Sequence, residues 1–280
     1  MLLFASQIRF SQTWLPAGVL ALCVVMGCGA EEYERRLNET KRYYNELERI
    51  ELNLAPKWTD GRIVDFIRVP KQFQAIPAPV PVKDDQGKEE MPAVDPRQPD
   101  FLNLVFPTPE LVGAWEAPFE VSIDGNLESR KAYIYVLSNY WIFAGENAAD
   151  ALTFTGSMIQ RIGEALDEQL PKDKLEPPPI KFPKPGGYFP SNSYSEFDFK
   201  PKPIKLGATT VPYTFTAYAR QNGNIQCMVL VAIPENVSSK EKLTERIPMM
   251  LEHFAITRTE PRPGQSANAA GPAQNTPSGF

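Results

Sequence analysis

Cysteine and histidine are scarce in this 280-residue chain, which has three cysteines and one histidine. Structural zinc sites usually take four cysteine or histidine ligands, and serine or cysteine nucleophiles are commonly activated by a histidine. Any such machinery would have to include His253. That residue lies near the end of a predicted helix, where a histidine side chain suits the helix dipole, so we predict a structural role for it. We expect no metal and no cofactor.

Motifs for nucleotides, nucleic acids and hydrolysis are also missing. The chain has 29 Lys and Arg against 34 Asp and Glu, a net charge of −5, without a long basic run. Nucleic-acid binding needs clustered bases, so we exclude a nucleic acid as a partner. There is no P-loop, no G-x-G-x-x-G and no G-x-S-x-G. We therefore predict that the protein is not an enzyme, although catalysis by two carboxylates needs no sequence motif and stays open.

The N-terminal segment carries one charged side chain, Arg9, before an apolar run over residues 15–26. This run is too short to span a bilayer, which takes about 20 apolar residues, but it has the length of the hydrophobic region of a secretory signal. It ends in the letters VVMGC, residues 24–28, which resemble the bacterial lipobox. The resemblance implies cleavage between Gly27 and Cys28 and acylation of Cys28. The alternatives are an uncleaved membrane anchor and an ordinary signal peptide with a chance cysteine.

Acylation of Cys28 would place the protein in the cell envelope. Several acyl chains hold a protein on a membrane, whereas one chain alone binds only marginally. We expect the domain to lie outside the cytoplasm, on the periplasmic or extracellular side. Cys23 would leave with the signal segment, so Cys227 would be the single cysteine of the domain and no intramolecular disulfide could form. Cys227 stands in an apolar strand pattern, which predicts a small buried hydrophobe.

The 28 prolines gather in three stretches, and apolar periodic segments lie between them. We predict a signal segment over residues 1–27, the lipidated cysteine and an amphipathic helix over 28–56, a single domain over 57–257 and a disordered tail over 258–280. Within the domain we expect proline-rich loops over residues 74–100 and 171–205.

The amphipathic helix is predicted from Glu31 to Leu54, because Tyr33, Leu37 and Tyr44 recur on one face among charged residues. This helix could stand off the membrane or pack loosely on the domain. Alternatively, its apolar face could form a coiled coil with a partner.

The domain pattern predicts hairpins alternating with helices. The expected elements are a strand over 63–69, a hairpin over 119–143 turning at Asp124-Gly125, a helix over 147–170 starting at Asn147, a hairpin over 213–233 with a type I′ turn at Asn222-Gly223, and a helix from Ser238 to Phe254 that Pro248 should kink or interrupt. In the second strand of the first hairpin, apolar residues fall on both faces, which predicts a central strand covered on both sides. The fold class is therefore α+β, with an antiparallel sheet of hairpins flanked by helices.

The stretch IRVPKQF, residues 67–73, and the closing hairpin and helix over residues 211–257 resemble the domain of PsbP, the extrinsic photosystem II protein, and its relatives. The resemblance implies an α/β/α sandwich with a central antiparallel sheet. The order of lipobox, helix, proline-rich stretch and domain also resembles uncharacterised bacterial lipoproteins. That second resemblance implies a location in the cell envelope, and it does not imply an activity.

Three functions are weighed. The first is a non-enzymatic interaction or scaffold module that contacts an envelope protein through loop aromatics. These aromatics are Tyr188, Phe189, Tyr194, Phe197 and Phe199, which could instead fasten the loop to the domain. The second is a small-molecule or carbohydrate-binding module with a pocket near Trp141 or Trp115. The third is a hydrolase with two carboxylates.

Overall fold

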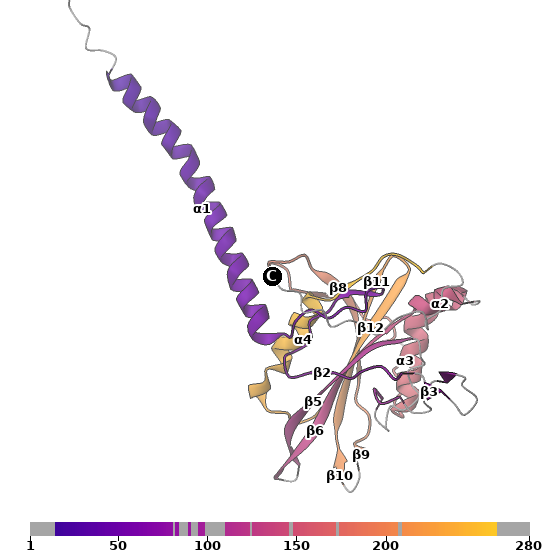
Figure 1. The fold of residues 1–280 in the computed structure, drawn as a ribbon. Helices are drawn as coiled ribbons and strands as arrows, with labels where there is room; N and C mark the ends of the chain where they lie inside the picture. The colour runs from indigo at the N-terminus through magenta and orange to yellow at the C-terminus, as the bar shows by residue number, and fades with distance from the viewer. Residues whose placement is uncertain are drawn as a thin grey trace, which may run out of the picture. The chain divides into compact units, whose positions relative to one another are not determined.

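The computed structural model describes residues 15–80, 82–83, 89–90, 95–98, 110–123, 125–145, 148–171, 174–206 and 209–261. The chain divides into two compact units, residues 1–49 and residues 50–280. The described part of the first unit is helical, and the second unit holds the sheet and the remaining helices (Figure 1).

Helix α1 (Leu15–Asn53) begins within the predicted signal segment and ends within one residue of the predicted helix end. In the first unit, Tyr33 is 68% exposed and Tyr44 is 63% exposed. Glu32 forms ion pairs with Arg35 and Arg36 on the helix surface. The predicted apolar stripe is therefore solvent-exposed within this unit. Among the described residues, no helix is both long enough and apolar enough to cross a membrane.

The second unit is built on a seven-stranded sheet in which every neighbouring pair of strands is antiparallel. Its order is β2 (Gln74–Ala75), β5 (Leu111–Ile123), β6 (Asn126–Ser138), β12 (Ile225–Pro234), β11 (Tyr213–Asn222), β8 (Asn192–Phe199) and β7 (Ile180–Phe182). The helices are α2 (Tyr140–Ala144), α3 (Phe154–Ala165) and α4 (Leu243–Glu252). The domain is thus α+β with an antiparallel sheet, as predicted.

Two buried clusters lie on opposite faces of this sheet. Strand β6 separates them: Tyr133 and Tyr135 point to the face covered by α3, whereas Ile134 and Val136 point to the face covered by α4. Strand β12 has every residue from Ile225 to Ala232 buried. The prediction of a central strand covered on both faces is confirmed for β6.

Both predicted hairpins form. Strands β5 and β6 pair from Leu111 to Ile123, so the first hairpin begins earlier than expected. In the second hairpin Asn222 pairs with Ile225, which makes Gly223 and Asn224 the two loop residues. Gly223 has a φ of +65°, and glycine at the first loop position is typical of a type II′ turn. The predicted type I′ turn centred on Asn222-Gly223 is therefore wrong by one residue.

The second strand of the first hairpin ends at Ser138 and not at Phe143. The chain turns into α2 at Asn139, which is fully buried and bonds to the chain that follows α2, to the turn between β11 and β12, and to β12 itself. Its amide nitrogen donates to the carbonyls of Ala151 and Asn224, at 2.9 and 3.0 Å. Its oxygen accepts from the backbone N–H of Gln226 at 2.9 Å. The prediction that Trp141 and Phe143 continue the strand is wrong.

The helix predicted over residues 147–170 is shorter in the structure. A 3₁₀ helix, η2 (Ala148–Thr153), precedes α3, and the predicted cap Asn147 lies outside the described residues. Beyond Ala165, the N–H of Glu168 donates to the carbonyl of Gly163 and that of Asp167 donates to Glu164, while Asp167 has a φ of 51°. This is the Schellman pattern, which ends a helix.

The two predicted loops contain ordered structure. Residues 171–205 hold β7, β8 and the start of β9 (Ile204–Leu206), which pairs with β10 (Thr209–Val211). Residues 74–100 hold β2 and a short ribbon of β3 (Val82–Lys83) with β4 (Glu89–Glu90). The prediction of continuous loops is wrong, because the prolines lie between these strands and not inside them.

An ion pair lies within residues 74–100. Asp95 and Arg97 are buried and join at 2.7 Å, and Arg97 also donates to the carbonyl of Leu111 at 3.0 Å. Burying a charge is costly unless it is paired and hydrogen-bonded. This pair therefore fixes the described part of the loop to the start of β5.

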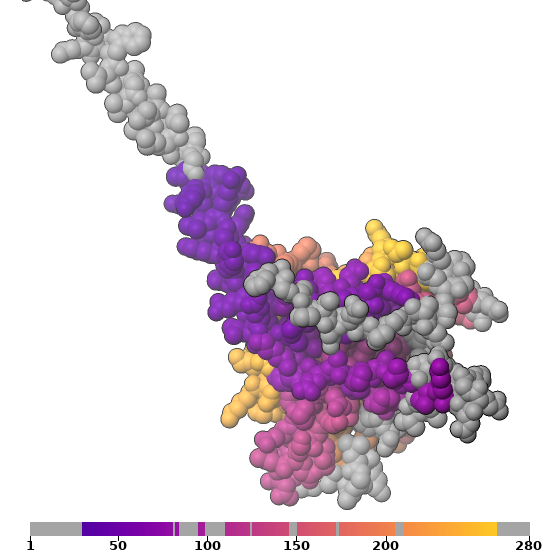
Figure 2. All heavy atoms as spheres, viewed as in Figure 1, coloured from indigo at the N-terminus to yellow at the C-terminus, as the bar shows by residue number. Residues whose placement is uncertain are grey.

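The segment that follows α1 packs along the sheet. β1 (Val64–Phe66) pairs with β13 (Ala255–Ile256), so the strand predicted over 63–69 is shorter and belongs to a separate two-stranded ribbon. The ring of Trp58 contacts that of Trp115 on β5 at 5.0 Å between centroids. Figure 2 shows this segment, in purple, lying across the face of the domain in that view.

The C-terminal helix starts later than predicted. Ser238 caps a 3₁₀ turn, η4 (Ser239–Glu241), and α4 begins at Leu243. Pro248 lies inside α4 without ending it, so of the two predicted effects, a kink or an interruption, the interruption does not occur. In the predicted tail, Pro261 is buried and the side chain of Glu260 accepts a bond from Asn224 at 2.8 Å. Residues 262–280, the rest of the predicted disordered tail, lie outside the described residues.

Replacing Asn139 with alanine should destabilise the domain by about 2–4 kcal/mol, because the carbonyls of Ala151 and Asn224 and the N–H of Gln226 lose their partner, and Ala151 and Gln226 are buried. Thermal unfolding of the full-length Cys28→Ser protein should shift downward by roughly 5–15 °C. Ser157→Ala on the exposed side of α3 is the control and should leave the midpoint nearly unchanged. An unchanged midpoint for Asn139→Ala would show that this network does not join α2 and η2 to the sheet.

Candidate functional site

The structure separates the five predicted loop aromatics into two groups. Tyr194, Phe197 and Phe199 lie in β8 and are 1%, 4% and 0% exposed. They were predicted in a loop because prolines flank the segment, but the backbone of Phe197 and Phe199 pairs with β11 and that of Tyr194 pairs with β7. These three side chains are part of the core and do not form an exposed surface for a partner protein.

Tyr194 and its neighbour Asn192 bind the C-terminal end of α4. The hydroxyl of Tyr194 donates to the carbonyl of Leu251 at 2.7 Å, and the amide of Asn192 donates to the carbonyls of Leu251 and Glu252. Burial raises the pKa of the Tyr194 phenol. The end of a helix leaves carbonyls without intrahelical partners. Both side chains thus have a structural role at the β8–α4 junction.

Tyr188 and Phe189 lie between β7 and β8. Tyr188 is 41% exposed, and its ring contacts that of Phe189 at 5.1 Å. Phe189 in turn packs edge-on against the ring of buried His253 at 5.0 Å. Phe189 therefore fastens this segment to the end of α4, and Tyr188 is the member of the predicted set that is exposed.

Neither tryptophan predicted to mark a pocket is among the residues that line the pocket described below. Trp115 is 2% exposed and packs on Trp58. Trp141 is half-buried, and the guanidinium of Arg62 lies over its ring at 5.5 Å from the centroid. Core packing explains Trp115, and the cation–π contact explains the position of Arg62.

Two carboxylates approach one another on β8. Glu196 and Asp198 share one side of the strand; burial, and secondly the charge of Asp198, raise the pKa of Glu196. Asp198 accepts from the hydroxyl of Thr216 at 2.8 Å, and Tyr218 is hydrogen-bonded to Glu196. Both acids are thus bound to side chains of the paired strand β11. These hydrogen bonds explain both carboxylates as members of cross-strand side-chain pairs.

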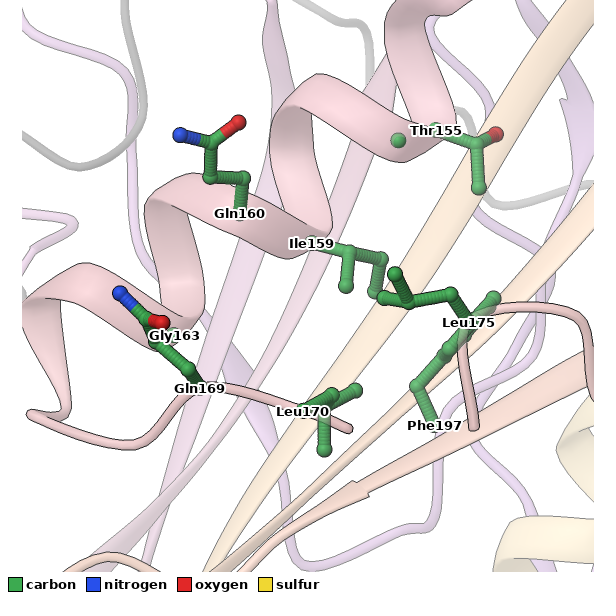
Figure 3. A pocket seen from close by; sticks show the side chains of 9 residues that line it. Thr155, Ile159, Gln160, Gly163, Gln169, Leu170, Leu175 and Phe197 are labelled. Atoms are coloured by element: carbon green, nitrogen blue, oxygen red, sulfur yellow. The ribbon is translucent and has the colours of Figure 1, made fainter. Parts of the chain in front are cut away.

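A pocket of about 350 Å³ opens between α3, the segment that follows it, and β8. Its lining residues are Thr155, Gly156, Ile159, Gln160, Gly163, Gln169, Leu170, Leu175 and Phe197. In the view of Figure 3, Ile159, Leu175 and Phe197 lie together, whereas the amide ends of Gln160 and Gln169 lie on the opposite side. No charged side chain is among these lining residues. The pocket therefore combines an apolar wall with amide groups.

Two glycines of α3 are among the residues that line this pocket. Gly163 is required by the fold, because a Cβ there would lie 2.5 Å from the carbonyl oxygen of Glu168. At Gly156 a Cβ would meet nothing within 4 Å. Glycine inside a helix costs about 1 kcal/mol relative to alanine. Neither packing nor backbone geometry explains Gly156, so its effect is to leave the pocket wide.

Sequence reasoning missed this pocket, since it treated Phe197 as a loop residue and α3 as a plain amphipathic helix. Gly156 and Gly163, seven positions apart on one helix, are the signal that could have indicated it. The chain matches no family model, and we found no match to it among curated proteins or solved structures.

Cys28, the predicted lipidation site, lies within α1, and its side chain is outside the described part of the chain. Cys227 lies on β12 and is fully buried, as predicted. Burial raises the pKa of its thiol to about 12. The thiolate is the reactive form of cysteine, so we expect the buried thiol of Cys227 to react slowly in the folded protein.

In the full-length Cys23→Ser, Cys28→Ser protein, Cys227 should be the only thiol and should resist a maleimide at pH 8. After unfolding in guanidinium, one thiol per chain should react completely within minutes, because exposure restores an ordinary pKa. Mass spectrometry before and after unfolding measures this. Rapid labelling of the native protein would contradict the buried position of β12.

Gly156→Ala should stabilise the protein by about 0.5–1 kcal/mol, because it removes the glycine penalty without a clash. Urea unfolding of the full-length Cys28→Ser background measures the change. Gly163→Ala is the opposite case and should destabilise, since its methyl group would meet the Glu168 carbonyl. A loss of stability in Gly156→Ala would mean that the backbone at this position needs glycine after all.

Proposed function

We propose that this protein is an envelope lipoprotein, held on a membrane by acyl chains on Cys28. The observation that carries the proposal is the VVMGC sequence at the end of a 12-residue apolar run, residues 15–26. The domain would then lie outside the cytoplasm, on the periplasmic or extracellular side. A lipid anchor requires no membrane-spanning helix.

The domain is proposed to act as a non-enzymatic interaction or scaffold module for another envelope protein. The exposed side chain of Tyr188, whose ring packs against the ring of Phe189, is one contact point for such a partner. Aromatic residues are enriched at protein interfaces because they bury a large area. The exposed stripe of α1, which includes Tyr33 and Tyr44, offers a second surface on the other unit.

We also propose that the domain shares the architecture of PsbP-like proteins. An antiparallel sheet with α3 against one face and α4 against the other supports this proposal. It concerns the arrangement of layers and carries no activity with it.

A second candidate function is the binding of a small molecule or a carbohydrate. The pocket between α3 and β8 favours it, because ligand sites are concave, mostly apolar and carry a few placed polar groups. This candidate is compatible with the first, since a tethered domain can bind a ligand and a partner protein.

Cys28→Ser should release the protein from the membrane fraction and abolish incorporation of an alkyne-palmitate label, because the thiol that accepts the lipid is gone. Cys23→Ser is the matched control, as it removes a cysteine five residues earlier and should leave both readouts unchanged. Fractionation, gel mobility and click labelling measure them. Retention of Cys28→Ser in the membrane would replace the lipoprotein proposal with an uncleaved anchor.

Crosslinking of detergent-solubilised envelopes then tests the scaffold role. The wild-type protein should bring down one defined partner, and Tyr188→Ala should reduce its recovery while the midpoint of thermal unfolding stays unchanged. If the membrane-bound wild type recovers no specific protein, the scaffold role is wrong, whatever the result for Cys28.

A further inference from the structure

The pocket between α3 and β8 restricts the chemistry of what it could hold. Its volume of about 350 Å³ lies at the lower end of the range of roughly 300–1,000 Å³ that is usual for small-molecule sites. None of its lining residues is charged. A charged ligand would lose its hydration without gaining a counter-ion. The pocket therefore favours an uncharged ligand.

The apolar wall favours a hydrocarbon body over a sugar. Ile159 and Phe197 are buried at 3% and 4% exposure, and Leu175 completes the wall although it is 47% exposed. Sugar sites commonly offer an exposed aromatic face, but the ring of Phe197 is almost wholly covered. A ligand that covers Leu175 would remove this exposed apolar side chain from water, and the burial of that surface would favour binding.

The polar groups of the pocket favour a ligand that donates a hydrogen bond. Gln160 already donates its amide nitrogen to Glu164 at 2.8 Å, which leaves its carbonyl oxygen as an acceptor. Thr155 donates its hydroxyl to Gln226 at 2.8 Å, which holds the first turn of α3 against β12. Gln169 supplies another amide. A hydroxyl group on the ligand fits these acceptors.

We propose that this pocket binds an uncharged aliphatic molecule that carries a hydroxyl group, of the fatty-alcohol or monoacylglycerol class. The inference rests on the second candidate function, small-molecule binding, and is independent of the lipid on Cys28. The bare backbone of Gly156 is part of the site, because it leaves room for the ligand along α3 at the expense of helix stability. A position where function and stability conflict is typical of a binding site.

The test uses the full-length Cys28→Ser protein without detergent and the neutral fluorescent probe N-phenyl-1-naphthylamine. The probe should bind saturably, and 1-decanol should displace it. Decanoate has the same chain length but carries a charge at pH 8, so it should compete about tenfold more weakly or worse. Maltose should not compete.

Two variants locate the binding. Gly156→Leu fills the pocket with a good helix former and should weaken probe binding about tenfold without lowering the unfolding midpoint. Ser157→Leu adds the same side chain at the neighbouring exposed position, outside the lining, and should leave binding within about twofold of wild type. Leu175→Gln changes an exposed lining residue without burying a polar group, and it should also weaken binding.

The outcomes separate the inference from the functions it rests on. Displacement by maltose and not by decanol would overturn the aliphatic ligand class while keeping small-molecule binding. Probe binding that survives both Gly156→Leu and Leu175→Gln would overturn the assignment to this pocket. If neither the probe nor the sugar binds, both the ligand class and the second candidate function are wrong, whereas the lipoprotein proposal stands or falls with Cys28 alone.

Discussion

Burial of strands β6 and β12 on both faces is the constraint on which the rest of this domain depends. Tyr135 and Leu137 face one side and Ile134 and Val136 face the other, so neither side of the sheet can be left in water. A sheet that is apolar on both faces needs a cover on each. Helix α3 with η2 forms one cover, and α4 with the chain after residue 54 forms the other. The pocket lies where the first cover is incomplete, beside β8.

The sequence predicts those elements whose information is local. The hairpins of β5–β6 and β11–β12 follow from alternation and from a glycine turn within a few residues. The sequence pattern does not predict strand β8, because its pairing with β11 joins segments about 20 residues apart and the surrounding prolines indicate a loop. The sequence pattern does not predict helix α2 either, because the contacts that set its start are made with residues distant in the sequence. Its sequence has high strand propensity, but Asn139 bonds to Ala151 and Gln226 and diverts the chain.

The candidate site shows the same division. Helix α3 could be predicted, yet its pocket requires β8 and the chain reversal at Asp167 to stand beside it, and neither is visible in periodicity. Phe197 illustrates the consequence: its aromatic ring beside prolines indicated a contact residue, whereas tertiary structure makes it part of a wall. By contrast, the VVMGC signal is entirely local, so the proposed location at a membrane can be argued from the sequence before any fold is known.

The proline stretches that obscured the loops have a physical role at the edges of the sheet. The edge strands are β2, with two residues, and β7, with three residues between Pro179 and Pro183. Proline has no N–H to donate, so it prevents an edge strand from growing and from pairing with another chain. For a protein tethered as we propose, neighbouring copies would be concentrated on one membrane surface, where edge-to-edge pairing would be a hazard. The short length of β2 and the prolines on either side of β7 oppose that pairing.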